Sequence, residues 1–114
     1  MVINNYVPDR KDIVWLEFSP QSGHEQRGKR PAIVLSPLKY NLKTGLAIFC
    51  PITSKIKGYP FEVKIENPRI HGVVLSDQVK SFDWKSRGIH FISQASDYEI
   101  ESVVSKLGVL LQAK

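Results

Sequence analysis

Apolar and polar residues alternate in short stretches through most of the chain, and this period of two predicts β-strands. The alternation is cleanest at residues 61–65, and most of the other stretches are rich in the β-branched and aromatic residues that strands favour. The predicted strands span residues 12–18, 31–36, 46–53, 61–65, 72–76, 78–82 and 89–92. Pro51 favours an edge position or a bulge in the third strand, because proline cannot donate a ladder hydrogen bond. Polar connections are predicted at residues 20–30, 37–44 and 54–60.

The last part of the chain changes to a helical period. Ser96 and Glu99 fit a capping box, which marks the start of a helix. An apolar stripe follows at helical spacing, formed by Ile100, Val103, Val104, Leu107 and Leu111. A helix over residues 96–111 is therefore predicted to lay this stripe on the sheet. Many short strands followed by one helix predict a mainly β fold, built as a strongly bent sheet or partial barrel.

Length and composition narrow the class of protein. The chain has 114 residues, which suits a single domain over residues 1–114, and 42% of them are hydrophobic. Lys and Arg number 16 against 11 Asp and Glu, so the net charge of +5 favours an anionic partner such as nucleic acid. The lone Cys50 lies in an apolar run and is expected to be a buried, unreactive thiol. No apolar run reaches the roughly 20 residues of a membrane span, so a cytoplasmic protein without membrane contact is expected.

The stretch GHEQRGKRPAIVLS at residues 23–36 places a polar, glycine-flanked loop directly before a strand. Its candidate functional residues are His24, Glu25, Arg27, Lys29 and Arg30. Glycine lets backbone amides approach an anion closely, and a guanidinium forks onto two phosphate oxygens. Arg30 is fixed by the strand that follows it, and Glu25 is expected to orient Arg30 or to act as a base. This loop is predicted to contact a phosphate backbone, although a solvated cationic loop has the same composition.

A second polar group follows the strand 46–53. Thr53 either bonds the turn after the strand or donates its hydroxyl to a phosphate oxygen that gains charge in a transition state. Lys55 and Lys57 follow it, and the ring of Tyr59 is a candidate platform for stacking on a base. Asp77 and Gln78 lie between two apolar runs, where a turn is the favoured interpretation.

The remaining aromatic and histidine residues are assigned to structure rather than chemistry. Trp15, Phe61 and Trp84 are expected mostly in the core, His71 in a loop, and His90 on the outward side of a strand. The histidines lack the spacing of a zinc site, and no phosphate-binding or dinucleotide fingerprint is present, so neither a metal nor a cofactor is expected.

Four motifs in order resemble those of the MazF/PemK/Kid group of bacterial toxins, across nearly the whole chain. They are KDIVWLEFSP, GHEQRGKRPAIVLSP, CPITSKIKGYPFEV and GVVLSDQVKSFDW, followed by the amphipathic helix. The resemblance implies an SH3-like partial barrel, a homodimer, and metal-independent cleavage of single-stranded RNA at short sequences. It further implies that the RNA's own 2′-hydroxyl attacks the phosphate, leaving a 2′,3′-cyclic phosphate and a 5′-hydroxyl.

The same resemblance assigns roles to individual residues. Arg30 and Thr53 match the catalytic Arg and Thr, and Glu25 is the nearby loop carboxylate. His24 and Asp77 match the machinery of the Kid-like branch, but Leu75 stands where that branch has Arg. Arg30 holds its proton too tightly to be a good base, so the general base is open among His24, Glu25 and Asp77, or Arg30 serves only as the acid. The predicted RNA-contacting residues are Arg27, Lys29, Lys55, Lys57, Tyr59, Gln78 and Lys80.

The implied protein partner is an acidic antitoxin that covers the basic groove and brings the toxin to DNA only indirectly. Two other functions remain open at this point. One is a gyrase-poisoning toxin on the same fold, although such relatives end with a Trp and this chain ends LLQAK. The other is an RNA-binding SH3-like module without catalysis.

Overall fold

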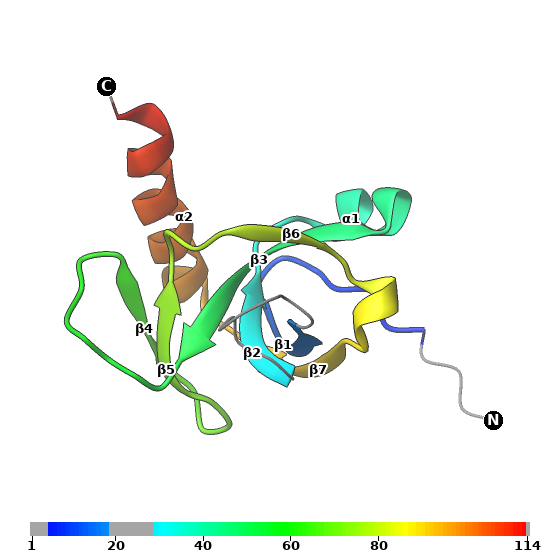
Figure 1. Cartoon of the computed structure of the whole chain (residues 1–114), viewed down its shortest axis with the longest axis horizontal. Coiled ribbons are helices and arrows are strands. Elements are labelled where there is room, and N and C mark those ends of the chain that lie inside the picture. The colour runs from blue at the N-terminus through cyan, green and yellow to red at the C-terminus, as the bar shows by residue number, and fades with distance from the viewer. Residues whose placement is uncertain (1–4, 19–28, 114) are drawn as a thin grey trace, which may run out of the picture.

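The computed structural model describes residues 5–18 and 29–113, and it is mainly β with a C-terminal helix. Figure 1 shows the described strands curling around one another, with the long helix standing on one side. In chain order the elements are β1 (Asp12–Glu17), β2 (Lys29–Val34), α1 (Leu38–Thr44), β3 (Leu46–Thr53), β4 (Glu62–Glu66), β5 (His71–Leu75), β6 (Lys80–Asp83), η1 (Lys85–Arg87), β7 (His90–Gln94) and α2 (Asp97–Gln112). Each predicted strand is present within a few residues of its predicted bounds.

The strands form one antiparallel sheet in the order β4-β5-β3-β2-β1-β7, with β6 also paired to β3. β3 is therefore an interior strand, and one of its edges is divided between two partners. Residues 46–49 pair with β6, whereas Ile52 and Thr53 pair with β5. The edge position expected for Pro51 is wrong, because β3 has partners on both sides. Pro51 lies between the two pairing stretches, where the ladder on that side is interrupted.

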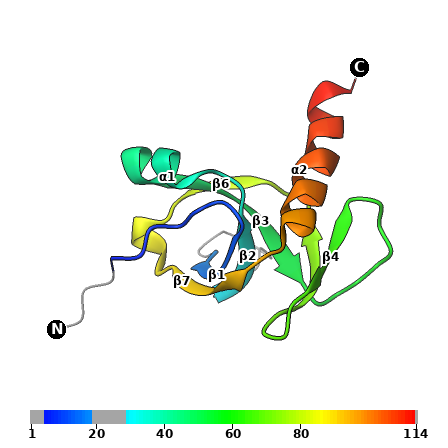
Figure 2. The same cartoon turned by 180° about the vertical axis from the view of Figure 1, so that it is seen from behind.

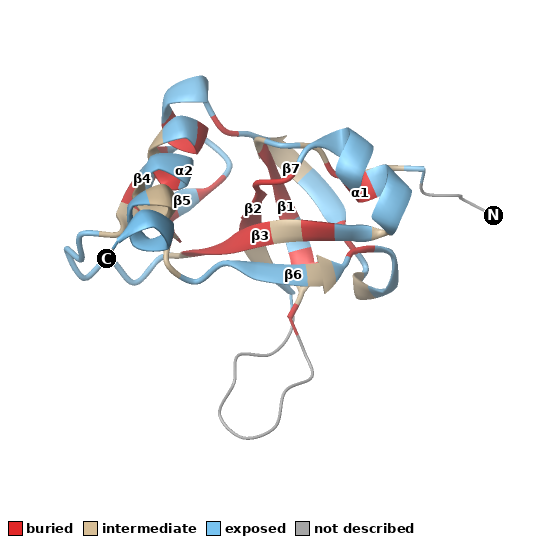
Figure 3. Ribbon diagram, turned by 90° about the horizontal axis from the view of Figure 1, so that it is seen from above, coloured by how far each residue is buried: buried red, intermediate tan, exposed pale blue. Residues whose placement is uncertain are grey.

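Two hydrophobic clusters share the sheet, one on each face. Alternate residues of the central strands enter different clusters, as Ile33 and Val34 of β2 illustrate. One cluster includes Ile100 and Val103 of α2, and the other includes Trp84. In the central strands β1, β2 and β3, Figure 3 shows runs of consecutive buried positions. The sheet is thus a curled half-barrel that is covered on both faces over much of its length.

The helix α2 covers the sheet with its first half only. Ile100 and Val103 are buried, and Leu107 packs against the same cluster, as the stripe predicts. The prediction is wrong for Val104 and Leu111, which are 38% and 76% exposed. The reason is visible in Figures 1 and 2, where the C-terminal half of the helix extends beyond the strands.

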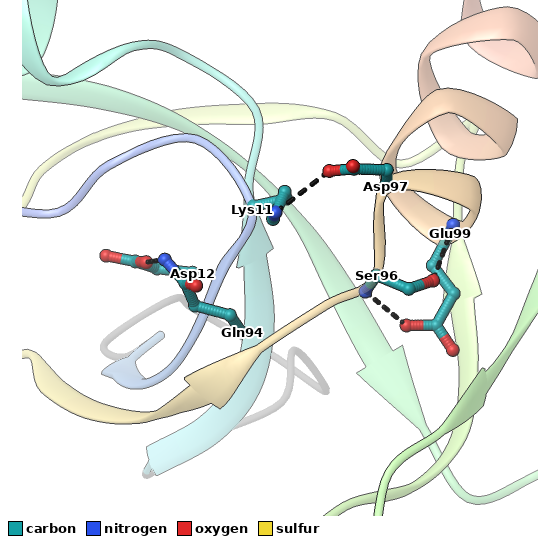
Figure 4. A network of polar contacts seen from close by, with 6 residues as sticks. All are labelled: Lys11, Asp12, Gln94, Ser96, Asp97 and Glu99. Atoms are coloured by element: carbon teal, nitrogen blue, oxygen red, sulfur yellow. Dashed lines mark hydrogen bonds and ion pairs between the residues drawn. The ribbon is translucent and has the colours of Figure 1, made fainter.

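The start of α2 is fixed by polar contacts, of which Figure 4 shows the capping box and the pair of Lys11 with Asp97. The predicted capping box is confirmed: Ser96 Oγ accepts from the Glu99 amide at 3.1 Å, and Glu99 Oε1 accepts from the Ser96 amide at 2.9 Å. The other oxygen of the buried Glu99 carboxylate accepts from the Glu66 amide at 2.7 Å. Lys11 Nζ contacts Asp97 Oδ1 at 2.9 Å. The helix therefore begins where the ends of β1 and β4 approach it.

Residues 37–44, predicted as a connection, form the short helix α1 instead. Its buried Asn41 explains the difference, because the side-chain amide donates to the carbonyl oxygens of Pro8 at 2.7 Å and Ser36 at 3.0 Å. The indole of Trp84, buried as expected, donates to the Asn41 carbonyl at 3.0 Å. Gly45 ends the helix in the left-handed conformation with φ of 74°. Tertiary contacts that propensity does not register thus stabilise this helix.

Candidate active site

β2 and β3 bring the two main sequence candidates together. The ladder pairs Ala32 with Pro51 and Ile33 with Cys50, and Arg30 and Thr53 each lie two residues beyond the first of these pairs. Arg30 was predicted to precede the strand, but β2 begins at Lys29 and includes it. Both side chains are half-buried. The guanidinium and the hydroxyl are therefore carried by adjacent strands rather than by a loop.

Arg30 and Thr53 line one open cavity of about 580 Å³. The described residues that line it come from β1, β2, the end of β3, and the turn before β5. They are Trp15, Arg30, Pro31, Ile52, Thr53, Ser54, Lys55, Arg69, Ile70 and His71. The volume lies within the range of pockets that hold a small ligand or part of a larger one.

The described part of the cavity is electropositive. It carries the cations Arg30, Lys55 and Arg69, and none of its described lining residues is acidic. The ion pairs of the described residues lie elsewhere, between Lys11 and Asp97 and between Lys64 and Glu66. Burial lowers the pKa of Arg30, but a guanidinium still holds its proton at neutral pH. Three cations without a described partner favour a bound phosphate group.

Thr53 is held by the turn that follows β3. Its Oγ1 accepts a hydrogen bond from the Lys55 amide at 3.1 Å. The hydroxyl proton is not used in that bond and remains available to a ligand oxygen in the cavity. The two interpretations from the sequence are therefore compatible, because one hydroxyl serves the turn as acceptor and a ligand as donor.

Asp77 is not brought to this cavity. It follows the far end of β5, where its Oδ2 accepts from the Tyr59 hydroxyl at 2.6 Å and its Oδ1 is buried without a partner among the described residues. That hydrogen bond and the charge of Asp77 raise the pKa of Tyr59. The ring of Tyr59 is 45% exposed, in agreement with its predicted place in an open loop.

The other predicted RNA-contacting residues are distributed over the surface. Lys29, Lys57, Gln78 and Lys80 are exposed, and none of them belongs to the described lining of the cavity. The backbone amide of Lys57 is fixed by Glu62 Oε2 at 3.0 Å. His24, Glu25 and Arg27 lie outside the described residues.

Trp15, Arg69 and His71 line the cavity but were not expected in the site. Trp15 was assigned to the core, but it is 39% exposed because β1 turns Val14 and Leu16 inward. The alternation of β1 contained this signal. His71 was assigned to a loop and instead begins β5, while Arg69 carried no local signal. Only the pairing of β5 with β3 places these two residues beside Thr53.

Other expectations concern residues away from the cavity. His90 is exposed at the start of β7, as predicted. Cys50 is buried, as predicted, and burial together with the charge of Asp77 raises its pKa to about 12. Within residues 5–18 and 29–113, no group of three or more His, Cys, Asp or Glu is placed to hold a metal ion. No helix in that part of the chain is long and apolar enough to cross a membrane.

Comparison with known proteins relates the whole of this architecture to one family. Residues 9–111 match the family described as PemK-like, MazF-like toxin of type II toxin–antitoxin system. The chain is 44% identical to the endoribonuclease toxin MazF of Escherichia coli K12, over 96% of this chain and 99% of that protein. It is 36% identical to the E. coli endoribonuclease toxin ChpB, over 91% and 94% of the two chains.

Solved structures agree with this match. The crystal structure of MazF from Deinococcus radiodurans superposes with a TM-score of 0.87 at 51% identity, covering 94% of this chain and 98% of that one. A crystal structure of a MazE–MazF complex from the same organism gives a TM-score of 0.85 at 44% identity, covering 96% and 100%.

Proposed function

Because the chain belongs to the PemK-like, MazF-like toxins of type II toxin–antitoxin systems, we propose that its endoribonuclease activity resides in the cavity where Arg30 meets Thr53. The observation that carries this proposal is that Arg30 and Thr53, on the paired strands β2 and β3, line the same cavity. The substrate is single-stranded RNA, and the chain acts as one domain over residues 1–114, as a homodimer in the cytoplasm.

The proposed reaction uses a nucleophile that the RNA supplies. The 2′-hydroxyl attacks the adjacent phosphorus, the bond to the 5′-oxygen breaks, and the products are a 2′,3′-cyclic phosphate and a 5′-hydroxyl. The protein therefore needs no activated serine or cysteine, only groups that align the backbone, stabilise the phosphorane and move two protons.

Arg30 and Thr53 suit charge stabilisation. A half-buried guanidinium donates two N–H groups in a fixed fork to the non-bridging oxygens, where the negative charge develops. The Thr53 hydroxyl adds one donor from the facing strand. Lys55 and Arg69 extend the positive surface along which a phosphate backbone lies.

A cognate antitoxin is the protein partner of this toxin, since relatives of this fold are solved as MazE–MazF complexes. We infer that an acidic segment of that antitoxin occupies the cationic cavity and so excludes RNA. A ternary complex with unchanged RNA affinity would contradict this competition.

The test is cleavage of a mixed-sequence single-stranded RNA in EDTA by the wild type, Arg30→Ala and Thr53→Ala. We expect cutting by the wild type, with cyclic phosphate ends, and a decrease of roughly 10²–10³-fold for each variant. Thr53→Ser, which keeps the hydroxyl, is the matched control and is expected to retain most of the activity.

Other outcomes separate the remaining functions. Salt-dependent RNA binding without cleavage by the wild type would indicate a binding module. Trapped cleaved DNA in a gyrase assay, with RNA left intact, would indicate a gyrase poison.

A further inference from the structure

Among the described residues that line the cavity, Arg30 and Thr53 suit charge stabilisation, but neither exchanges a proton readily. Attack by a 2′-hydroxyl requires a base to remove its proton. Arg30, Lys55 and Arg69 are cations that hold their protons, and the Thr53 hydroxyl is a weak base. Histidine is the side chain that most readily takes up and releases a proton near neutrality. Among the described lining residues, His71 alone has this property.

The backbone fixes the position of His71 relative to Thr53. β5 pairs with β3 through Thr53 and Val73, so His71, two residues before Val73, is the diagonal neighbour of Thr53 across the ladder. Residue 72 between them is a glycine packed against the Thr53 carbonyl. His71 therefore begins the strand whose backbone contacts Thr53, and its side chain lines the same cavity.

We propose that His71 is the general base of the reaction, an assignment that rests on the ribonuclease function proposed above. Its neutral imidazole takes the proton of the 2′-hydroxyl as the bond from the 2′-oxygen to phosphorus forms. The bond from phosphorus to the 5′-oxygen breaks, and the departing oxygen takes one proton from water. The imidazolium then releases its proton to solvent, so protons and charges balance over one turnover.

Charged groups face His71 from two sides. Arg30, Lys55 and Arg69 line the same cavity, where they attract the phosphate of the substrate. On the other side, β4 pairs Glu66 with His71, and Lys64 Nζ lies 3.9 Å from that carboxylate. Only a neutral imidazole accepts a proton, so cleavage by this mechanism is expected to rise with pH.

The test compares His71→Asn with His90→Asn, because His90 is also an exposed first residue of a strand but does not line the cavity. Single-turnover cleavage is measured from about pH 5 to pH 9, the range in which histidines titrate. We expect the wild type and His90→Asn to share one inflection. His71→Asn is expected to lose that inflection and to fall roughly 10²–10⁴-fold. Its affinity for uncleavable 2′-O-methyl RNA is expected to stay near that of the wild type.

Two results would overturn the assignment without affecting the proposed function. One is cleavage by His71→Asn within about three-fold of the wild type, with the inflection retained, while Arg30→Ala is inactive. The other is a histidine titration followed by NMR in which 2′-O-methyl RNA leaves the imidazole signals of His71 unmoved. The NMR experiment uses the wild-type protein and so does not depend on the folding of a variant. If the wild type itself fails to cleave RNA, the proposed function is wrong and the assignment is overturned with it.

Discussion

A β carbon at residue 72 would lie 2.3 Å from the carbonyl oxygen of Thr53 and 2.9 Å from its carbonyl carbon. The hydrogen in place of a side chain on Gly72 is thus what allows β5 to pack against the end of β3. Gly72 also has φ of 143°, which side-chain-bearing residues rarely adopt. One glycine therefore sets the distance between the strand that ends at Thr53 and the strand that begins at His71.

Gly72→Ala is expected to separate β5 from β3. We expect a loss of roughly 2–4 kcal/mol in the free energy of unfolding, because the neighbouring atoms are backbone and cannot move aside, and the backbone angle is strained as well. Urea unfolding measures the loss, and cleavage under conditions where the variant stays folded is expected to fall too.

Gly88→Ala is the control for Gly72→Ala. Gly88 also has a positive φ, of 60°, but a β carbon there would meet nothing within 4 Å. Gly88→Ala is therefore expected to lower the free energy of unfolding by only about 1 kcal/mol, because only the backbone conformation is strained. Equal losses from the two variants would show that the contact with Thr53 is not responsible.

Lys55 and Arg69 are expected to contribute to RNA affinity through phosphate contacts. For uncleavable single-stranded RNA, each contact adds about 0.7 to the slope of the logarithm of affinity against the logarithm of salt concentration. Lys55→Ala and Arg69→Ala are each expected to reduce the slope by about that amount. Lys43→Ala, on the distant helix α1, is the control and is expected to leave the slope unchanged. An unaltered slope in both cavity variants would contradict the proposed path of the backbone.

Trp15 is expected to report RNA binding, because it lines the cavity and the second tryptophan, Trp84, is buried. A base stacked on the exposed indole contributes roughly 1–3 kcal/mol and quenches its fluorescence. Quenching by 2′-O-methyl RNA is expected to persist in Trp84→Phe and to vanish in Trp15→Phe. Quenching that survives in Trp15→Phe would place the RNA elsewhere.

Cys50 is expected to make folding sensitive to alkaline pH. Burial, with the charge of Asp77, raises the pKa of the thiol from its ordinary 9.0 to about 12 in the folded protein. Between these values the unfolded chain releases the proton and the folded chain keeps it, so stability is lost as the pH rises. The slope approaches roughly 1.4 kcal/mol per pH unit for this one group.

Urea unfolding at a series of pH values measures the contribution of the thiol. Cys50→Ala has no thiol to ionise, so its stability is expected to decline less steeply above pH 9 than that of the wild type. Parallel declines in the two proteins would assign the loss to other groups.

Local sequence signals predicted most of the fold. The period of two identified the strands, and the capping box at Ser96 identified the start of α2, because both depend on near neighbours in the chain. The helix α1 was missed because Asn41 is held by Pro8 and Trp84, which are distant in sequence. The exposed end of α2 was missed because its apolar spacing does not reveal where the sheet beneath it stops.

The candidate site, like the fold, was predictable where the signal is local in the sequence. Arg30 and Thr53 were singled out by their motifs, and in the structure both line one cavity at the ends of the paired strands β2 and β3. Arg69 and His71 were not identified from the sequence, because neither stands in a motif. Both reach the cavity through the pairing of β5 with β3. Such a long-range pairing has no signature in either strand alone, apart from the glycine that it requires at position 72.

The burial of both faces of the central strands limits where this fold can acquire new chemistry in evolution. A substitution in the middle of β1, β2 or β3 alters one hydrophobic cluster or the other, whichever way its side chain points. Strand ends are free of this constraint, because at Arg30 and Thr53 the packing gives way to an open cavity. A new substrate preference therefore arises most readily at the rim and the adjoining turns, while the strands keep Arg30 and Thr53 in place.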